Sequence, residues 1–215
     1  MPDTKPRWER RKDARPQELL AAALDLFVER GYAATRLDDV AARAGVSKGT
    51  LYLYFANKEE LFKAMIRENM LPVLGEAESA IEHFEGHSAI LFREIVLGWW
   101  ERIGNTPLSG ITKLMMAESS NFPEVARFYH DEVISRANAM VASMLERGMQ
   151  RGEFRRVDPE QVTQIVVAPM LMLMMSKHSF AFCRQGKPLS VQAYLDSFID
   201  VMLNGLVIPA PAGNA

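Results

Sequence analysis

Hydrophobic positions recur every three or four residues along almost the whole chain, which is the period of an α-helix. The first stripe consists of Leu20, Ala23, Leu24, Phe27 and Val28. Later stripes predict one or two helices over residues 61–81, interrupted near Pro72 and Gly75, and single helices over residues 87–103, 108–119, 123–151, 159–184 and 191–206. No β-type alternation of useful length and no internal repeat interrupts this pattern. The sequence therefore predicts an all-α fold.

The first sixty residues contain shorter stripes separated by tight turns. Gly31 is expected to end the first helix and Gly45 the second. Thr35, Ser47 and Asn57 each precede an apolar stripe and are expected to cap the second, third and fourth helices. The sequence thus predicts three short helices before the longer ones begin.

Residues 35–55 have the spacing of a helix-turn-helix, with the turn at Ala44-Gly45-Val46. In such a motif the second helix enters the DNA major groove. A small helical subdomain with no DNA role is the alternative at this point.

The outward positions of the second helix suit DNA recognition. Lys48 can reach a phosphate or a guanine edge, and Gly49 lets the backbone approach closely. Thr50 offers a hydroxyl and a methyl group to a base edge, while Tyr52 and Tyr54 offer phenolic hydroxyls to phosphates. These residues are candidate DNA contacts.

Lys58 is a sixth candidate, at the start of the following helix. A cation there opposes the helix macrodipole, but a helix N-terminus binds anions, so the placement suits a docked phosphate. A solvated lysine is the alternative.

Composition adds few constraints. Of the 215 residues, 48% are apolar and 24% are charged, as in average soluble domains. The single cysteine, Cys183, excludes an internal disulfide and a cysteine-paired zinc site. The longest apolar run, residues 165–175, is shorter than the roughly 20 residues that span a bilayer, and the polar, basic start does not look like a secretory leader. We therefore expect a soluble, cytoplasmic protein that does not associate with a membrane.

Charge is distributed unevenly. The net charge is −2, yet residues 1–15 hold six basic residues against three acidic ones. The basic ones are Lys5, Arg7, Arg10, Arg11, Lys12 and Arg15. A basic arm on an acidic body suggests a polyanion at the N-terminus, and a solvated chain end is the alternative.

The segment from Phe27 to Leu61 resembles the N-terminal domain of the TetR/AcrR family of transcriptional regulators. It reads FVERGY over residues 27–32, has Thr35, and reads VAARAGVSKGTLYLYFANKEEL over residues 40–61. The resemblance implies a DNA-binding domain over residues 1–60 and an effector-binding and dimerisation domain over residues 61–215. It also implies an Ω-shaped homodimer whose first three helices bind a palindromic operator. Thr50, Tyr52, Tyr54 and Lys58 match the family's usual DNA-contacting positions, and Lys48 and Gly49 match the start of its recognition helix.

The C-terminal region is rich in methionine, with ten of the thirteen residues at or after Met115. Methionine packs around different shapes, so this region predicts a pocket for an apolar or amphipathic small molecule, with ordinary core packing as the alternative. The candidate lining residues are Phe92, Val96, Trp99, Trp100, Met115, Phe128, Met144, Met170 and Met174.

The last helix has a single apolar stripe formed by Leu195, Phe198, Ile199, Met202, Leu203 and Leu206. Such a stripe covers either the chain's own core or a second chain, and the family resemblance favours a dimer interface made with the helix over residues 159–184.

The sequence has no phosphate-binding glycine loop. No catalytic residue, metal site or cofactor is predicted. The sequence indicates a ligand-responsive DNA-binding regulator, most simply a repressor. An enzyme or carrier built on a helical bundle is the alternative class.

Overall fold

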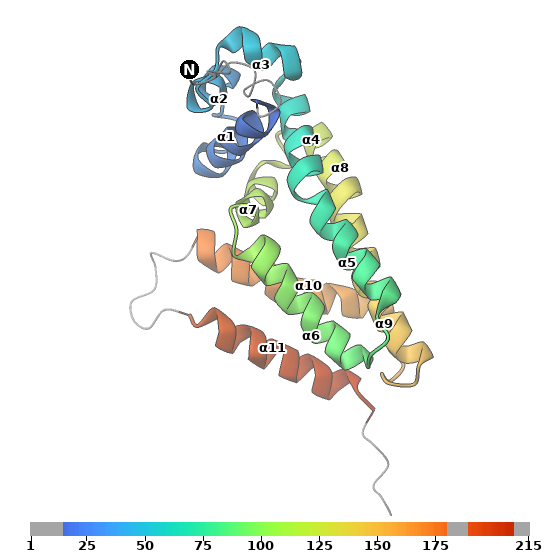
Figure 1. Ribbon diagram of the computed structural model, residues 1–215. Helices are drawn as coiled ribbons and strands as arrows, with labels where there is room; N and C mark the ends of the chain where they lie inside the picture. The colour runs from blue at the N-terminus through green and yellow to red at the C-terminus, as the bar shows by residue number, and fades with distance from the viewer. Residues whose placement is uncertain (1–14, 180–188, 209–215) are drawn as a thin grey trace, which may run out of the picture.

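The computed structural model describes residues 15–179 and 189–208, and this part of the chain is all-α, as predicted. A head formed by α1 (Arg15–Arg30), α2 (Leu37–Arg43) and α3 (Lys48–Tyr54) lies at one end of the molecule (Figure 1). The rest comprises α4 (Lys58–Asn69), α5 (Leu71–His83), α6 (Ser88–Trp99), the π-helical turn η2 (Trp100–Gly104), α7 (Ser109–Glu118), α8 (Pro123–Tyr129), the π-helical turn η3 (His130–Ile134), α9 (Ser135–Gln150), α10 (Pro159–His178) and α11 (Val191–Leu206).

Some predicted features fall outside the described residues. They are the basic arm apart from Arg15, Cys183, and residues 180–184 of the helix predicted over 159–184. Within the described ranges, no helix is both long enough and apolar enough to cross a lipid bilayer.

Two of the three predicted N-terminal caps are confirmed. Ser47 Oγ accepts a hydrogen bond from the Thr50 amide at 3.1 Å, and Asn57 Oδ1 accepts one from the Glu60 amide at 2.9 Å. The predicted Thr35 cap is wrong. Its hydroxyl is buried and donates to Gly31 O at 2.7 Å, because the last turn of α1 leaves carbonyl groups that need partners.

The predicted long helices contain breaks that hydrophobic periodicity does not reveal. The helix predicted over residues 123–151 is α8, η3 and α9 in succession, and the one over 87–103 is α6 followed by η2. A π-helical turn inserts one extra residue, so it rotates the side chains that follow it relative to those before it.

Two hydrophobic cores hold the described helices together. The first joins the head to α7 and α8, through buried side chains such as Phe27, Phe62, Ile111 and Leu114. The second lies between α6, α9, α10 and α11, and the half-buried Trp99 packs against both. The first core therefore couples the head mechanically to helices of the body.

Most of the α11 stripe that was predicted as a dimer interface lies inside the single chain. Its side chains lie in the chain's own second core: Leu195, Phe198, Ile199 and Leu206 are buried, and Met202 and Leu203 pack against the same cluster. The physical reason is that α11 has one broad apolar stripe, and α6 and α10 already cover it.

A charged cluster ties the end of α9 to the start of α6. Glu153 accepts hydrogen bonds from the Ser88 amide at 2.8 Å and from Arg151 Nε at 2.9 Å. Arg147 donates to the carbonyls of Phe84 at 2.7 Å and Gly86 at 3.0 Å. Burial alone would raise the pKa of Glu153, but the hydrogen bonds from Ser88 and Arg151 outweigh it and lower the pKa to about 2.

We expect this carboxylate to make stability depend on pH. Since its pKa falls from 4.5 to about 2 on folding, Glu153 stabilises the fold above pH 4.5, and the contribution disappears as the pH falls toward 2. Glu153→Gln should therefore lower the Tm at pH 7, by an amount that shrinks between pH 4.5 and 2. Calorimetry over this range checks it, with the exposed Glu146→Gln as control. A Tm difference that stays constant with pH would contradict the prediction.

Candidate nucleic-acid interface and ligand cavity

Helices α2 and α3 form the helix-turn-helix that the spacing predicts. Gly45 has φ +68°, a backbone conformation that favours glycine, and the Val46 amide closes the turn by donating to Ala41 O at 3.0 Å. Leu51 is completely buried and anchors α3 to the head. The opposite side of α3 consequently faces away from the body (Figure 1).

The predicted contact residues of α3 lie together on its accessible surface. Lys48 and Gly49 are exposed, Thr50 is half-buried, and Tyr52 and Tyr54 are both exposed. A Cβ added to Gly49 would meet only one atom, at 3.8 Å, so nothing within the described chain demands a glycine there. An external surface that approaches the backbone closely would explain it.

Lys48 is paired within the head. Its Nζ lies 2.9 Å from Asp38 Oδ1 and 5.9 Å from the centre of the Tyr52 ring. The hydrogen bond to Asp38 raises the pKa of Lys48. Any phosphate or base that Lys48 contacts must therefore compete with the Asp38 carboxylate.

Two further residues of this surface were missed by the sequence analysis. Leu53 is 83% exposed and lies one turn after Gly49, on the side of α3 opposite Leu51. A helical projection of α3 would have revealed it. The exposed Arg36 lines a polar hollow of about 290 Å³ together with Lys48, Tyr52 and Lys58, and only the packing of α2 on α3 shows this.

Lys58 has a structural role that the sequence did not reveal. Its Nζ donates to three backbone carbonyls, those of Tyr32 at 2.6 Å and of Ala33 and Thr35 at 3.1 Å. It also lies 4.5 Å from the centre of the Tyr32 ring. An ammonium group has three N–H donors, so none remains for a phosphate while these bonds persist. Burial lowers the pKa of Lys58.

Lys58→Ala should destabilise the turn between α1 and α2. Losing hydrogen bonds from a charged donor costs about 2 kcal/mol, which lowers the Tm by roughly 4–8 °C. The variant should bind DNA more weakly without changing the salt dependence. Arg36→Ala is the matched control: it should leave the Tm unchanged and reduce the log–log salt slope by about one for each copy of the chain on the DNA. If Lys58→Ala instead reduces the slope and spares the Tm, Lys58 is a phosphate contact.

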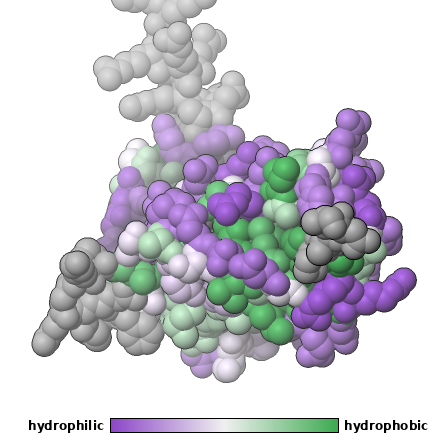
Figure 2. All heavy atoms as spheres, turned by 90° about the horizontal axis from the view of Figure 1, so that it is seen from below, coloured by the Kyte–Doolittle hydropathy of each residue, from purple (hydrophilic) through white to green (hydrophobic). Residues whose placement is uncertain are grey.

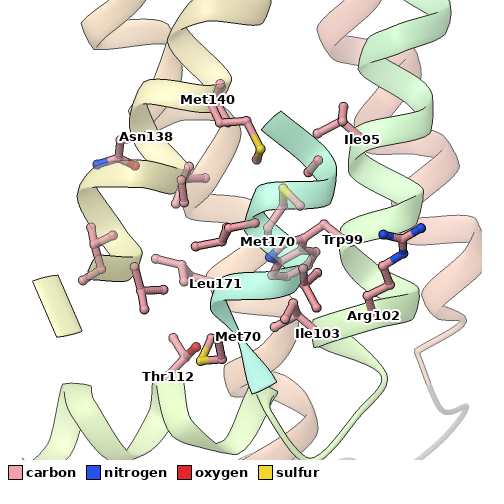
Figure 3. A pocket seen from close by; sticks show the side chains of 18 of the residues that line it. Met70, Ile95, Trp99, Arg102, Ile103, Thr112, Asn138, Met140, Met170 and Leu171 are labelled. Carbon is pink, nitrogen blue, oxygen red and sulfur yellow. The ribbon is translucent and has the colours of Figure 1, made fainter. Parts of the chain in front are cut away.

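The body contains a cavity of about 700 Å³, shown in Figure 3. Its walls come from α5, α6, η2, α7, α8, η3, α9 and α10, and most of the lining side chains are apolar. Six of the nine predicted residues line it: Val96, Trp99, Met115, Met144, Met170 and Met174.

The other three predicted residues do not line the cavity. Phe92 is fully buried in the second core, where its ring centre lies 6.2 Å from that of Phe198. Trp100 begins the η2 turn and is buried in the same core. Phe128 packs beside the first core, with Arg67 5.0 Å from its ring centre. Each belongs to a predicted helix, but to a face turned away from the cavity.

The sequence analysis missed the wall formed by α5. The residues there are Val73, Leu74, Ala77 and Ala80, with Met70 just before the helix. They recur with helical period, and this signal was readable in the sequence. From α9 the structure adds Asn138, Met140 and Val141.

Helix α7 separates the cavity from the head. Thr112, Met115, Met116 and Ser119 line the cavity from one face. On the other face, Gly110 packs so closely on α1 that an added Cβ would lie 2.5 Å from Val28 Cγ1. At the end of α7, Glu118 Oε1 accepts a hydrogen bond from the Ala33 amide at 3.2 Å. A displacement of α7 by a ligand would therefore reach α1 directly.

Comparison with known proteins agrees with both halves of this structure. The sequence model described as "Bacterial regulatory proteins, tetR family" matches residues 19–65. The model described as "Tetracyclin repressor-like, C-terminal domain" matches residues 92–181.

Similar proteins include two regulators from other bacteria. The HTH-type transcriptional activator FasR of Mycolicibacterium smegmatis is 46% identical over 59 residues, which is 27% of either chain. The fatty acid metabolism regulator protein of Bacillus subtilis is 27% identical over 146 residues, covering 67% of this chain and 74% of that one.

Solved structures share the fold. The transcriptional regulator FadR of Bacillus subtilis, in complex with stearoyl-CoA, has a TM-score of 0.74 at 20% identity, covering 88% of this chain and 98% of that one. A TetR-family regulator from Mesorhizobium loti has a TM-score of 0.70 at 20% identity, covering 95% and 100%. With a helix-turn-helix head, a helical body and matches to both family domains, this chain belongs to the TetR family of bacterial transcriptional regulators.

Proposed function

We propose that this regulator is a homodimeric repressor, released from a palindromic operator when an apolar or amphipathic small molecule fills the cavity. The observation that supports this most directly is the position of α7, which lines the cavity with Met115 and packs on Val28 of α1 through Gly110. In this proposal residues 1–60 bind DNA, and residues 61–215 dimerise and bind the effector.

In the DNA complex, α3 is the recognition helix. Lys48 and Thr50 read base edges, Gly49 lets the backbone of α3 approach the DNA closely, and Tyr52 and Tyr54 contact phosphates. The exposed position of Leu53 beside them suits an apolar contact with a thymine methyl group. Lys58 holds the turn before α2 through its carbonyl contacts, and so acts on DNA binding through the position of α2.

The dimer interface is the outer face of α10 and α11 rather than the inner stripe. Ile165 and Met172 of α10 are 57% and 58% exposed, and Val201 of α11 is 69% exposed. The space-filling view from below shows hydrophobic surface in the middle of this end of the molecule, where α11 lies (Figure 2). Exposed Ala168 and Ala193 would let two such helices approach closely.

The effector class follows from the cavity and is supported by the relatives. The lining is mostly apolar, so binding draws on burial of apolar surface. The Bacillus subtilis relatives are a regulator named for fatty acid metabolism and a structure with bound stearoyl-CoA. We therefore expect a long hydrocarbon body, with an acyl chain as the first candidate.

Release requires the effector to prefer the conformation that does not bind DNA. A tenfold loss of operator affinity needs about 1.4 kcal/mol of differential binding. An occupied cavity supplies this by displacing α7, which moves α1 through the Gly110–Val28 contact.

The proposal is tested with an operator duplex selected from random sequences on the full-length protein, and with stearoyl-CoA and oleate as probes. Operator affinity, measured by fluorescence anisotropy, should fall at least tenfold with a probe bound, and by reciprocity the operator should weaken probe binding by the same factor. A reporter gene behind the operator should be silent without probe. Unchanged operator affinity with the cavity occupied, or a reporter that the protein activates, would contradict the proposal.

A further inference from the structure

The apolar cavity contains one pair of buried hydroxyl groups. Thr112 of α7 and Tyr129 of α8 both line it, and they are 9% and 4% exposed. Their oxygen atoms lie 3.3 Å apart, in a long hydrogen bond. Figure 3 shows the Thr112 side chain pointing toward the cavity beside Met70, at the end where α4 meets α5.

This pair has a hydrogen-bond donor to spare. Two hydroxyl groups have two protons, and the bond between Thr112 and Tyr129 uses one of them. Within the described residues, neither oxygen makes a second hydrogen bond. Burial raises the pKa of Tyr129, so the phenol keeps its proton at neutral pH. A buried donor without an acceptor is costly, and a ligand atom that accepts from it removes that cost.

We propose that Thr112 and Tyr129 form a subsite that donates a hydrogen bond to a neutral carbonyl oxygen, of a ketone, ester or thioester, on an otherwise apolar effector. This inference rests on the proposed function, because it assumes that the cavity binds the effector. It adds the chemical group that distinguishes the effector from a plain hydrocarbon.

A carboxylate does not fit this subsite. Among the described residues that line the cavity, the basic side chains are the guanidinium of Arg102 and the imidazole of His130. Arg102 is paired with Glu76, and Figure 3 shows it on a different side of the cavity from Thr112. His130 Nδ1 bonds to Asp131 at 3.0 Å in an exposed position. A carboxylate at the hydroxyl pair would therefore be buried without a counter-charge, which is strongly unfavourable.

The position of Thr112 also connects this subsite to DNA binding. It lies on the same helix as Gly110, two residues away, and Gly110 is the residue that packs on Val28 of α1. A carbonyl held by Thr112 thus binds directly to the helix that separates the cavity from the head.

The experiment compares two probes of nearly equal shape, 2-acetylnaphthalene and 2-ethylnaphthalene, which differ by a carbonyl in place of a methylene group. Their dissociation constants are measured by calorimetry on the full-length wild type, Thr112→Val, Tyr129→Phe and the double variant. Removing both hydroxyls should weaken the ketone relative to the hydrocarbon by about threefold to tenfold. Met115→Leu, on the same face of α7, is the control and should change both constants by the same factor.

A third probe tests the charge of the ligand group. At pH 7.5 the carboxylate 2-naphthoate should bind at least tenfold more weakly than the ketone. The inference is overturned if both neutral probes bind and the variants do not change the ratio of their dissociation constants. It is also overturned if 2-naphthoate binds more tightly than the ketone. Either result leaves the proposed function intact. If neither neutral probe binds at its solubility limit and neither acyl probe binds, the cavity is not an effector site, and the inference is overturned with it.

Discussion

Raising the salt concentration from 50 to 200 mM should weaken operator binding by roughly a thousandfold, since the expected log–log slope is about −5. Each protein–phosphate contact releases counterions from DNA. The cations expected to contribute are Arg36 and Lys48 of the head and the basic residues before Arg15, each doubled by the symmetry of a dimer. Anisotropy titrations of the selected operator at several KCl concentrations measure the slope. A nearly flat salt dependence would contradict phosphate-dominated binding.

Substitutions on α3 separate base reading from phosphate binding. Thr50→Ala and Lys48→Ala should relax the preference among operator variants, because these side chains are placed to read base edges. Asp38→Asn should strengthen binding, because it removes the carboxylate that lies 2.9 Å from Lys48 Nζ and competes with DNA. If the Thr50 and Lys48 variants keep full sequence discrimination, α3 is not the recognition helix.

The double substitution Met172→Asp and Val201→Asp should convert the dimer to a folded monomer and reduce operator affinity by about a hundredfold. Both side chains are more than half exposed in the single chain, so the charges cost little until a second chain covers them. Each half-site is then bound independently, and the gain from linking two binding sites disappears. Light scattering and anisotropy measure the two effects.

Two control variants make this result specific to the outer face. Ile90→Asp introduces the same charge at an exposed position of α6 and should leave the protein dimeric. Leu195→Asp places a charge in the second core and should unfold the chain rather than dissociate it, since Leu195 is 1% exposed. A double variant that remains dimeric at micromolar concentration would exclude the outer face as the interface.

Local sequence signals were sufficient for the elements of the head. The Ser47 and Asn57 caps and the glycine at position 45 act within a few residues, so their effect can be predicted from the sequence alone. The Thr35 cap was predicted wrongly, because Arg36 occupies the N-cap position of α2. The Thr35 hydroxyl lies instead at the end of α1, 2.7 Å from Gly31 O and 3.1 Å from Leu26 O.

The sequence predicted that the cavity would be apolar, but it identified only some of the residues that line it. Helical period identifies an apolar face, as at Met115 and Met144, but does not say which neighbour covers it. The π-helical turns η2 and η3 change the facing of the residues that follow them, and no hydrophobic pattern encodes these turns. The Thr112–Tyr129 pair joins positions 17 apart on two helices, and only their packing brings the oxygens together.

By itself the sequence determined the all-α class, the helix-turn-helix and the family, because these follow from hydrophobic period, turn residues and a dense local motif. Only the tertiary structure showed which apolar stripes are buried within the chain and which partners the polar side chains contact. Most of the α11 stripe lies in the chain's own core, where α6 and α10 cover it. Lys58 donates hydrogen bonds to three carbonyls that lie more than twenty residues before it. Both outcomes depend on which groups the fold brings next to one another, and the order of residues in the sequence does not reveal this.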